Sequence, residues 1–119
     1  MKYHNQRTPC LSRHEHASKL EANYCNQLRL LVKAKKYKEY TSQVRFPLDI
    51  NGNHICDIVV DFLVMENNEK LVVHETKGYV TRDWKLKHKM FMALYPRIDF
   101  IVIGGQKTWE TRRKRTSSR

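Results

Sequence analysis

The sequence predicts an α/β domain in which a helix, three strands, a second helix and a fourth strand follow one another. Apolar residues recur at helical spacing in two segments, 17–36 and 81–94. Three apolar, strand-like segments separated by turn residues lie between them, and a short apolar run follows the second helix. A strand–helix–strand unit is most simply a right-handed crossover that sets the last strand parallel to a neighbour. We therefore expect a mixed four-stranded sheet flanked by helices.

Charge and cysteine content restrict the classes of protein that fit. The chain has 119 residues, which suits one domain with a modest core. Lys and Arg total 23 against 12 Asp and Glu, and the net charge of +11 favours nucleic acid as a partner before membrane. A basic protein whose charge serves only solubility is the alternative. The three cysteines form no CxxC pair, which favours free thiols in a reducing cytosol.

The N-terminal residues 1–16 show no clear period and are predicted to form an arm or loop. They lack the apolar core of a signal peptide, and no apolar run in the chain approaches the about 20 residues of a membrane span. Histidines and Cys10 lie in this arm, but their spacing matches no standard zinc pattern. We divide the chain into this arm, a core of residues 17–105 and a basic tail of residues 106–119.

The first predicted helix, residues 17–36, has Ser18 as a possible N-cap. Its apolar residues fall on one arc at about 100° per residue. They are Ala17, Leu20, Tyr24, Cys25, Leu28, Leu31 and Val32. Glu21 lies near the middle of that arc, where a helix that needed only packing would carry an apolar residue. This position makes Glu21 a candidate functional acid.

Three consecutive antiparallel strands are expected next. In the first, Val44, Phe46, Leu48 and Ile50 alternate with polar residues, as in a half-buried strand. Asn51-Gly52 is a strong signal for a tight hairpin turn. The second strand is expected over residues 54–65. Residues 66–69 make another turn, and residues 70–77 form the third strand, which ends at Gly78.

The second helix, residues 81–94, is predicted to bury Leu86, Met90, Ala93 and Leu94, which follow the i, i+4, i+7, i+8 pattern. Three basic residues, Arg82, Lys85 and Lys89, share another face. We expect that face to contact DNA phosphates. Pro96 ends the helix, and residues 99–103 form the last strand before Gly104-Gly105.

The C-terminal tail is the one compositionally biased segment of the chain. We expect it to be disordered and to bind phosphate without sequence preference, through Arg112, Arg113, Lys114 and Arg115. The alternative is a tail that only increases solubility.

Acidic residues inside the predicted strands point to a metal site. Asp61 lies within the second strand, and Glu75 and Lys77 close the third. Because side chains alternate across a strand, Glu75 and Lys77 share one face, and Asp61 approaches Glu75 if the two faces coincide. Two close carboxylates repel unless a positive charge lies between them, and Mg²⁺ prefers oxygen ligands. The alternative is a salt bridge between Asp61 and Lys77.

Four further residues near these strands or in the tail are assigned lesser roles. His74 lies on the opposite strand face from Glu75, so we expect it to pack or to form a hydrogen bond. Asp57 lies about 13 Å from Asp61 by strand rise and is expected to neutralise a basic neighbour. Trp84 and Trp109 can stack on bases, but packing is the commoner use of tryptophan.

The motifs, in this order, resemble the core of the PD-(D/E)XK nuclease superfamily, and more narrowly small phage and prophage proteins of that superfamily that contain a domain of unknown function. The resemblance covers residues 3–103 and rests on the segments Ser18-Lys19-Leu20-Glu21-Ala22, Val60-Asp61-Phe62, Val73-His74-Glu75-Thr76-Lys77-Gly78 and Trp84-Lys85-Leu86-Lys87-His88-Lys89. Val60 stands where the motif has its proline, and the segment 9–17 lacks the glycine turn and aromatic residue expected before the first helix.

The resemblance implies a restriction-endonuclease-like fold and a divalent-metal-dependent phosphodiesterase acting on DNA. It implies that Asp61 and Glu75 bind Mg²⁺, for which Mn²⁺ can substitute. Glu21 would support that ion or bind a second one, and Lys77 would position the water. Lys85 and Lys89 would contact phosphate or the edge of the site.

Our functional hypothesis is a Mg²⁺-dependent endonuclease of phage type, active in the cytoplasm of a bacterial host, without a small-molecule cofactor or a membrane partner. A branched or four-way DNA junction resembling a Holliday junction is the favoured substrate over a generic nicking substrate, and cutting two strands would require a homodimer. One alternative is a non-catalytic nucleic-acid-binding module with a nuclease-like core. Another is an RNA-binding protein of ribosomal type, which would leave Glu21 unexplained.

Overall fold

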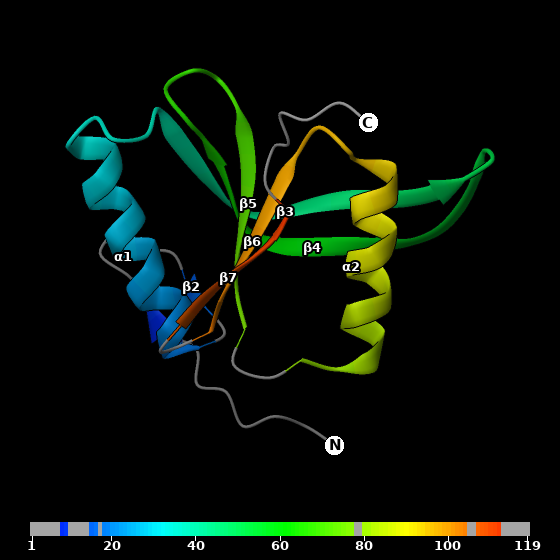
Figure 1. Cartoon of the computed structure of the whole chain (residues 1–119). Helices are drawn as coiled ribbons and strands as arrows, with labels where there is room; N and C mark the ends of the chain where they lie inside the picture. Colours follow the sequence, from blue (N-terminus) through cyan, green and yellow to red (C-terminus); the bar gives the residue numbers. More distant parts are fainter. Residues whose placement is uncertain (1–7, 10–14, 17, 78–79, 105–106, 113–119) are drawn as a thin grey trace.

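The computed structural model describes residues 8–9, 15–16, 18–77, 80–104 and 107–112 of the chain (Figure 1). Two helices and five longer strands make up the domain, and two short strands lie before them. Their bounds are β1 Thr8–Pro9, β2 Glu15–His16, α1 Lys19–Lys33, β3 Glu39–Ile50, β4 Asn53–Met65, β5 Leu71–Thr76, α2 Arg82–Leu94, β6 Asp99–Gly104 and β7 Lys107–Arg112.

The main sheet has the strand order β3-β4-β5-β6-β7. β5 and β6 are parallel, as the crossover through α2 predicts, and the other neighbours are antiparallel. The predicted α/β layout, α-β-β-β-α-β with a mixed sheet and flanking helices, is therefore confirmed.

β7 is the one main strand that was not predicted. The segment Lys107–Arg112 was assigned to the basic tail, but it pairs with β6 and adds a fifth strand. Thr108, Trp109 and Thr111 favour extended structure, and the edge of β6 offers unpaired backbone groups. The basic residues of this segment predicted a tail, although its β-branched and aromatic residues favour a strand. Arg113, Lys114 and Arg115 lie outside the described residues.

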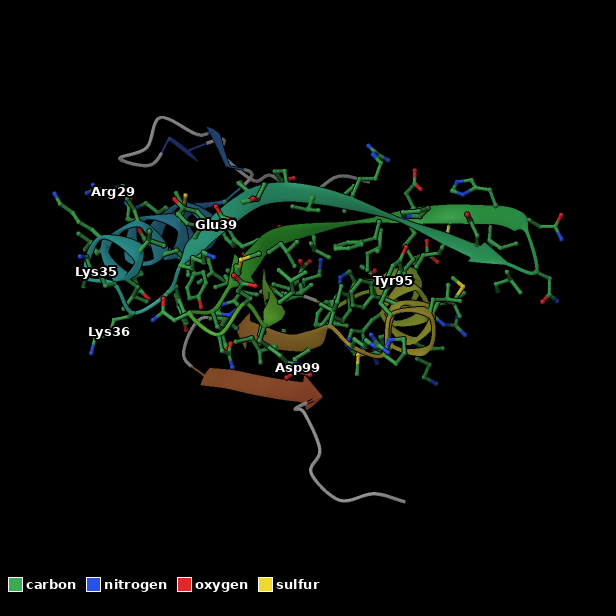
Figure 2. The ribbon with its side chains drawn as sticks, turned by 90° about the horizontal axis from the view of Figure 1, so that it is seen from above. Arg29, Lys35, Lys36, Glu39, Tyr95 and Asp99 are labelled. Atoms are coloured by element: carbon green, nitrogen blue, oxygen red, sulfur yellow. The ribbon has the colours of Figure 1, made fainter. Side chains whose placement is uncertain are left out.

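α1 begins at a capped N-terminus. Ser18 has an extended backbone, and its hydroxyl accepts a hydrogen bond from the Glu21 N–H at 3.2 Å, which confirms the predicted cap. The helix ends at Lys33, before the predicted Lys36, because Lys35 adopts a φ of 64°. Lys35 and Lys36 project beyond this end, away from the sheet (Figure 2).

α2 buries a face that only partly matches the predicted one, because Met90 alone of the four predicted residues packs against the core. Leu86 is 58 % exposed, and Ala93 and Leu94 are also exposed. Trp84, Phe91 and Tyr95 pack inward instead, at i, i+7 and i+11. Two apolar arcs compete on this helix, and the aromatic one wins because its side chains remove more apolar surface from water.

β3 and β4 form a long hairpin that passes from α1 to α2 (Figures 1 and 2). Its turn is the predicted Asn51-Gly52, where φ values of 52° and 81° match the left-handed conformations of a tight two-residue hairpin turn. Near α1 the hairpin contributes Phe62 and Val64 to one core cluster. Near α2 it contributes to a second cluster, whose buried members are Leu48, Ile58, Val60, Val73, Phe91, Phe100 and Val102.

β1 and β2 pair with each other antiparallel inside the predicted N-terminal arm. The side chains of this arm, including its histidines and Cys10, lie outside what the structure describes. Among the described residues, no helix has both the length and the apolar character that a membrane crossing requires.

Candidate metal and nuclease site

The predicted acids meet where β4 separates from β5. The ladder between these strands ends at Phe62 and His74. One residue further, the Asp61 N–H donates to Oε1 of Glu75 at 2.8 Å, and the Thr76 N–H donates to Oδ2 of Asp61 at 2.9 Å. Backbone donors released by the diverging strands need partners, and here the two carboxylates supply them. Each acid is therefore held by the backbone of the other strand.

Thr76 adds a second bond to Asp61. Its hydroxyl donates to the same Oδ2 at 2.6 Å. The other oxygen, Oδ1, has no hydrogen-bond partner among the described residues. Asp61 thus has one carboxylate oxygen for internal structure and one for a further ligand.

Burial raises the pKa values of both carboxyl groups of the pair. Burial, and then the charge of Asp61, raises the pKa of Glu75 from 4.5 to about 8. Burial, and then the charge of Glu21, raises the pKa of Asp61 from 3.8 to about 6, although the Thr76 bonds and Lys77 oppose the rise. Glu75 is only 2 % exposed. The two carboxyl groups titrate together, and the metal-free pair retains a proton near neutral pH.

Lys77 is the cation nearest to this pair among the described residues. Its Nζ lies 3.5 Å from Oε2 of Glu75, and its side chain is 24 % exposed. The same Nζ lies 5.1 Å from the ring centroid of Trp84, within cation–π range. The buried indole Nε1 of Trp84 has no hydrogen-bond partner, yet the indole lowers the pKa of Glu75. We infer that this N–H lies beside the carboxylate without good hydrogen-bond geometry, so Trp84 borders both groups.

Glu21 reaches the site from α1. It is 4 % exposed, as its place in the apolar arc predicts, and its negative charge raises the pKa of Asp61. Its Oε2 accepts a hydrogen bond from Nε2 of Gln43 on β3 at 2.6 Å. The four residues predicted for the site, Glu21, Asp61, Glu75 and Lys77, therefore lie in one neighbourhood.

A complete set of metal ligands is not assembled within the described part of the chain. No group of three or more His, Cys, Asp or Glu side chains there has the arrangement to hold an ion. Oδ2 of Asp61 and Oε1 of Glu75 already accept backbone hydrogen bonds. Of this pair, Oδ1 of Asp61 accepts no hydrogen bond from the described residues, and Oε2 of Glu75 faces Lys77. An octahedral cation held by these two oxygens would fill its other positions with water and substrate phosphate.

His74 has a structural role, as predicted. It lies on the α1 side of β5, where its Nδ1 and the Tyr24 hydroxyl are 2.5 Å apart and Tyr37 packs edge-on. Burial lowers the pKa of His74 to about 4, so the ring is neutral near pH 7. It takes no part in the acidic cluster.

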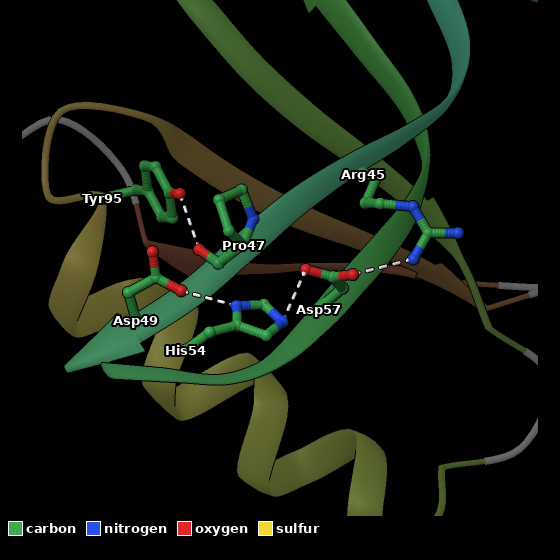
Figure 3. Close-up of polar contacts among 6 residues, drawn as sticks. All are labelled: Arg45, Pro47, Asp49, His54, Asp57 and Tyr95. Carbon is green, nitrogen blue, oxygen red and sulfur yellow. Dashed lines mark hydrogen bonds and ion pairs between the residues drawn. The ribbon is translucent and has the colours of Figure 1, made fainter. Parts of the chain in front are cut away.

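Asp57 also behaves as predicted. It accepts from Nη1 of Arg45 at 2.9 Å, and Nε2 of His54 lies 3.5 Å from its other oxygen (Figure 3). His54 in turn contacts Asp49 through Nδ1. This polar network lies along the β3–β4 hairpin, where Arg45 neutralises Asp57 and His54 bridges Asp57 and Asp49.

The basic face of α2 surrounds a hollow of about 460 Å³, called here the α2 hollow. The predicted phosphate-binding residues Arg82, Lys85 and Lys89 line it together with Asp83 and the exposed Leu86. Trp84 lies on the inward side of the same helix, stacked on His88 with 4.9 Å between ring centroids, so its main role is packing. The side chains of Arg112 and Trp109 lie outside the described part of the chain.

Three residues of the site were not identified from the sequence. Thr76 occupies the unspecified position of the Glu-x-Lys triplet, and its hydroxyl was the only local signal. Trp84 lies in the first turn of α2, on a different element from Lys77, so its contact with Lys77 depends on how α2 packs. Gln43 carries no sequence signal, because its role requires a local irregularity in β3.

Comparisons with known proteins give a family but no activity. Residues 1–111 match a family model described as a protein of unknown function, DUF1064. No curated protein and no solved structure matches the chain significantly.

Proposed function

We propose that this chain, which belongs to the DUF1064 family of proteins of unknown function, is a divalent-metal-dependent DNA endonuclease. The observation that carries the proposal is the clamp between Asp61 and Glu75. Backbone bonds hold the buried carboxylate of Glu75 and the half-buried carboxylate of Asp61 together although their charges repel. A purely structural role would be served as well by uncharged side chains, since isolated buried charges destabilise a fold.

The donor set fits Mg²⁺ or Mn²⁺. The oxygens of Asp61 and Glu75 are hard ligands, and the proton that the metal-free pair retains marks a place where a cation would be favourable. Asp61 and Glu75 would hold the ion, and Glu21 would support it from α1. When bound, the ion would polarise the phosphate and stabilise the leaving oxygen.

Lys77 would act on the reacting groups. Its ammonium lies beside Glu75 and is partly exposed, so it can donate a hydrogen bond to an attacking water and stabilise negative charge that develops at the phosphorus. Glu75 and Trp84 hold the ammonium in place from two sides. An ammonium cannot accept a proton, so the positive charge of Lys77 would favour loss of the water's proton to solvent.

Charge distribution supports DNA as the substrate. The net charge of +11 favours a polyanion, and the basic residues of the α2 hollow lie on the helix that also positions Trp84 at the site. A small domain of this kind reads backbone and shape more than sequence, which favours a branched or four-way DNA structure. One site cuts one strand, so a homodimer would cut two. A phage or prophage origin and action in the cytoplasm of a bacterial host complete the proposal.

Cleavage of a panel of labelled DNAs tests the proposal. Linear, single-stranded, flap and four-way substrates are incubated with the protein and Mg²⁺ or EDTA. We expect Mg²⁺-dependent cutting, most strongly on branched DNA, and loss of cutting but not of binding in Lys77→Ala. Lys38→Ala is the matched control, because Lys38 forms an exposed ion pair with Glu69 and neither residue belongs to the candidate site. Equal cutting by the Lys77→Ala protein would refute the assignment of Lys77.

A non-catalytic DNA-binding module is the second candidate. It is favoured by one observation, that no set of three ligand side chains is assembled among the described residues. Calorimetric titration with Mn²⁺ separates the candidates. Binding that disappears in Asp61→Asn supports the nuclease, and the absence of such binding supports the module.

A further inference from the structure

Gln43 has a backbone conformation that its residue type disfavours. Its φ is 58°, in the left-handed region, which is strained for a residue with a long side chain. The other described non-glycine residues with positive φ, Lys35, Asn51 and Glu69, lie in turns or just beyond a helix end. Gln43 lies inside a strand. Such a conformation persists only where the surrounding structure requires it.

The irregularity occurs beside the acidic cluster. The β3–β4 register pairs Ser42 with Phe62 and Val44 with Val60, and it leaves Gln43 and Asp61 facing each other without a ladder pair. β3 is therefore distorted at the residue opposite Asp61. β5 lies along the other edge of β4, and there Asp61 bonds to Glu75.

The distortion directs the amide of Gln43 toward α1. Although Gln43 is an exposed residue, its Nε2 donates to Oε2 of the buried Glu21 at 2.6 Å. The Ser18-x-x-Glu21 spacing matches a capping box, in which a glutamate would bond the N-terminus of its own helix. One carboxylate oxygen of Glu21, Oε2, is held by a different element, β3.

We propose that Gln43 is a positioning residue that holds the carboxylate of Glu21 toward Asp61 and thereby couples α1 to the ion-binding strands. The inference deepens the proposed function and rests on it. A neutral amide suits this task, because it orients a carboxylate without neutralising it. A lysine or arginine at this position would compete with the divalent ion for the same negative charge.

Substitution by glycine separates this role from a structural one. Gln43→Gly removes the amide and also relieves the backbone strain, because glycine adopts positive φ readily. Relief of strain and loss of the bond to buried Glu21 oppose each other, so we expect the free energy of unfolding to change little. Mn²⁺ affinity should fall about tenfold to a hundredfold, the loss expected for one hydrogen bond to a charged group. A residue with only a structural role would not weaken ion binding while stability is kept. Gln43→Asn is the matched variant, since it tolerates the same φ and keeps a shortened amide; partial recovery of affinity is expected.

The double variant identifies the partner. If Gln43 acts through Glu21, then Gln43→Gly has no further effect on Mn²⁺ affinity, measured by calorimetry, in the Glu21→Gln protein. On the best-cut DNA, kcat falls in Gln43→Gly while KM is unchanged. Unchanged Mn²⁺ affinity in Gln43→Gly, or losses that multiply in the double variant, would overturn the inference.

These experiments distinguish failure of the proposed nuclease function from failure of the positioning role of Gln43. A wild-type protein that cuts no DNA but binds Mn²⁺ in a manner that depends on both Gln43 and Glu21 would refute the nuclease and support the positioning role. A wild-type protein that binds no divalent ion would overturn both.

Discussion

Replacing Glu75 with glutamine should change how folding stability depends on pH. Burial and the charge of Asp61 raise the pKa of Glu75 from 4.5 to about 8 in the folded protein. The folded protein therefore binds more protons than the unfolded chain between these two values. The stabilisation that comes from this carboxyl is complete below its ordinary pKa and is lost as pH rises through its folded pKa. In the metal-free wild type, Glu75 thus becomes a destabilising charge as pH increases.

The size of the effect follows from proton linkage. A difference of one bound proton changes the unfolding free energy by about 1.4 kcal/mol per pH unit, so raising pH from about 6 to about 8 should cost the wild type about 2 kcal/mol through Glu75. Glu75→Gln removes the titration. Because Asp61 titrates together with Glu75, the difference between the two proteins reports the coupled pair, and the other titrations are shared to first order.

Urea unfolding in EDTA at several pH values measures this difference. We expect the wild type to lose stability relative to Glu75→Gln as pH rises, and Mg²⁺ to restore more stability to the wild type. Glu69→Gln is the control, because Glu69 is exposed and its pKa is lowered by Lys38, outside this pH window. Parallel pH profiles for the wild type and Glu75→Gln would refute the buried, proton-retaining pair.

Three further predictions concern the surroundings of the site. Trp84→Leu removes the ring near Lys77 and should lower kcat about threefold to thirtyfold, which corresponds to a partly desolvated cation–π contact. Trp84→Phe keeps a ring and should lower kcat less. An unchanged kcat in Trp84→Leu would contradict this role. Thr76→Val removes the hydroxyl bond to Asp61 and should lower the unfolding free energy by about 1–2 kcal/mol, while Thr76→Ser should retain most of the stability; urea unfolding decides. Alanine substitution of each basic residue of the α2 hollow should weaken DNA binding equally for all DNA sequences. The slope of log K against log salt concentration, measured by fluorescence anisotropy, should fall by about one for each phosphate that is no longer bound. An unchanged slope would show that the substituted residue binds no phosphate.

Local patterns were sufficient for the elements and for much of the candidate site. Alternation along β5 places Glu75 and Lys77 on one face, and turn residues set β4 antiparallel to β5. These two facts bring Asp61 opposite Glu75. The apolar arc of α1 likewise predicts the burial of Glu21.

Other features depended on competition between distant segments. α2 has two apolar arcs, and only the packing of Phe91 and Tyr95 against Phe46 of β3 selects one of them. β7 forms because β6 offers an open edge to pair with. The charge of residues 106–119 does not predict this pairing. In both cases the local preference was present but did not decide the outcome.

The sequence by itself determined which acids and which lysine form the candidate site and in which order the two helices and the first four main strands follow. It did so because strand alternation, helix periodicity and turn residues act over a few positions. Only the tertiary structure decided how the carboxylates are held. Where β4 leaves β5, unpaired backbone N–H groups require acceptors, and Asp61 and Glu75 meet that need. The contact of Gln43 with Glu21 likewise exists only because strand and helix are brought together across 22 positions of sequence.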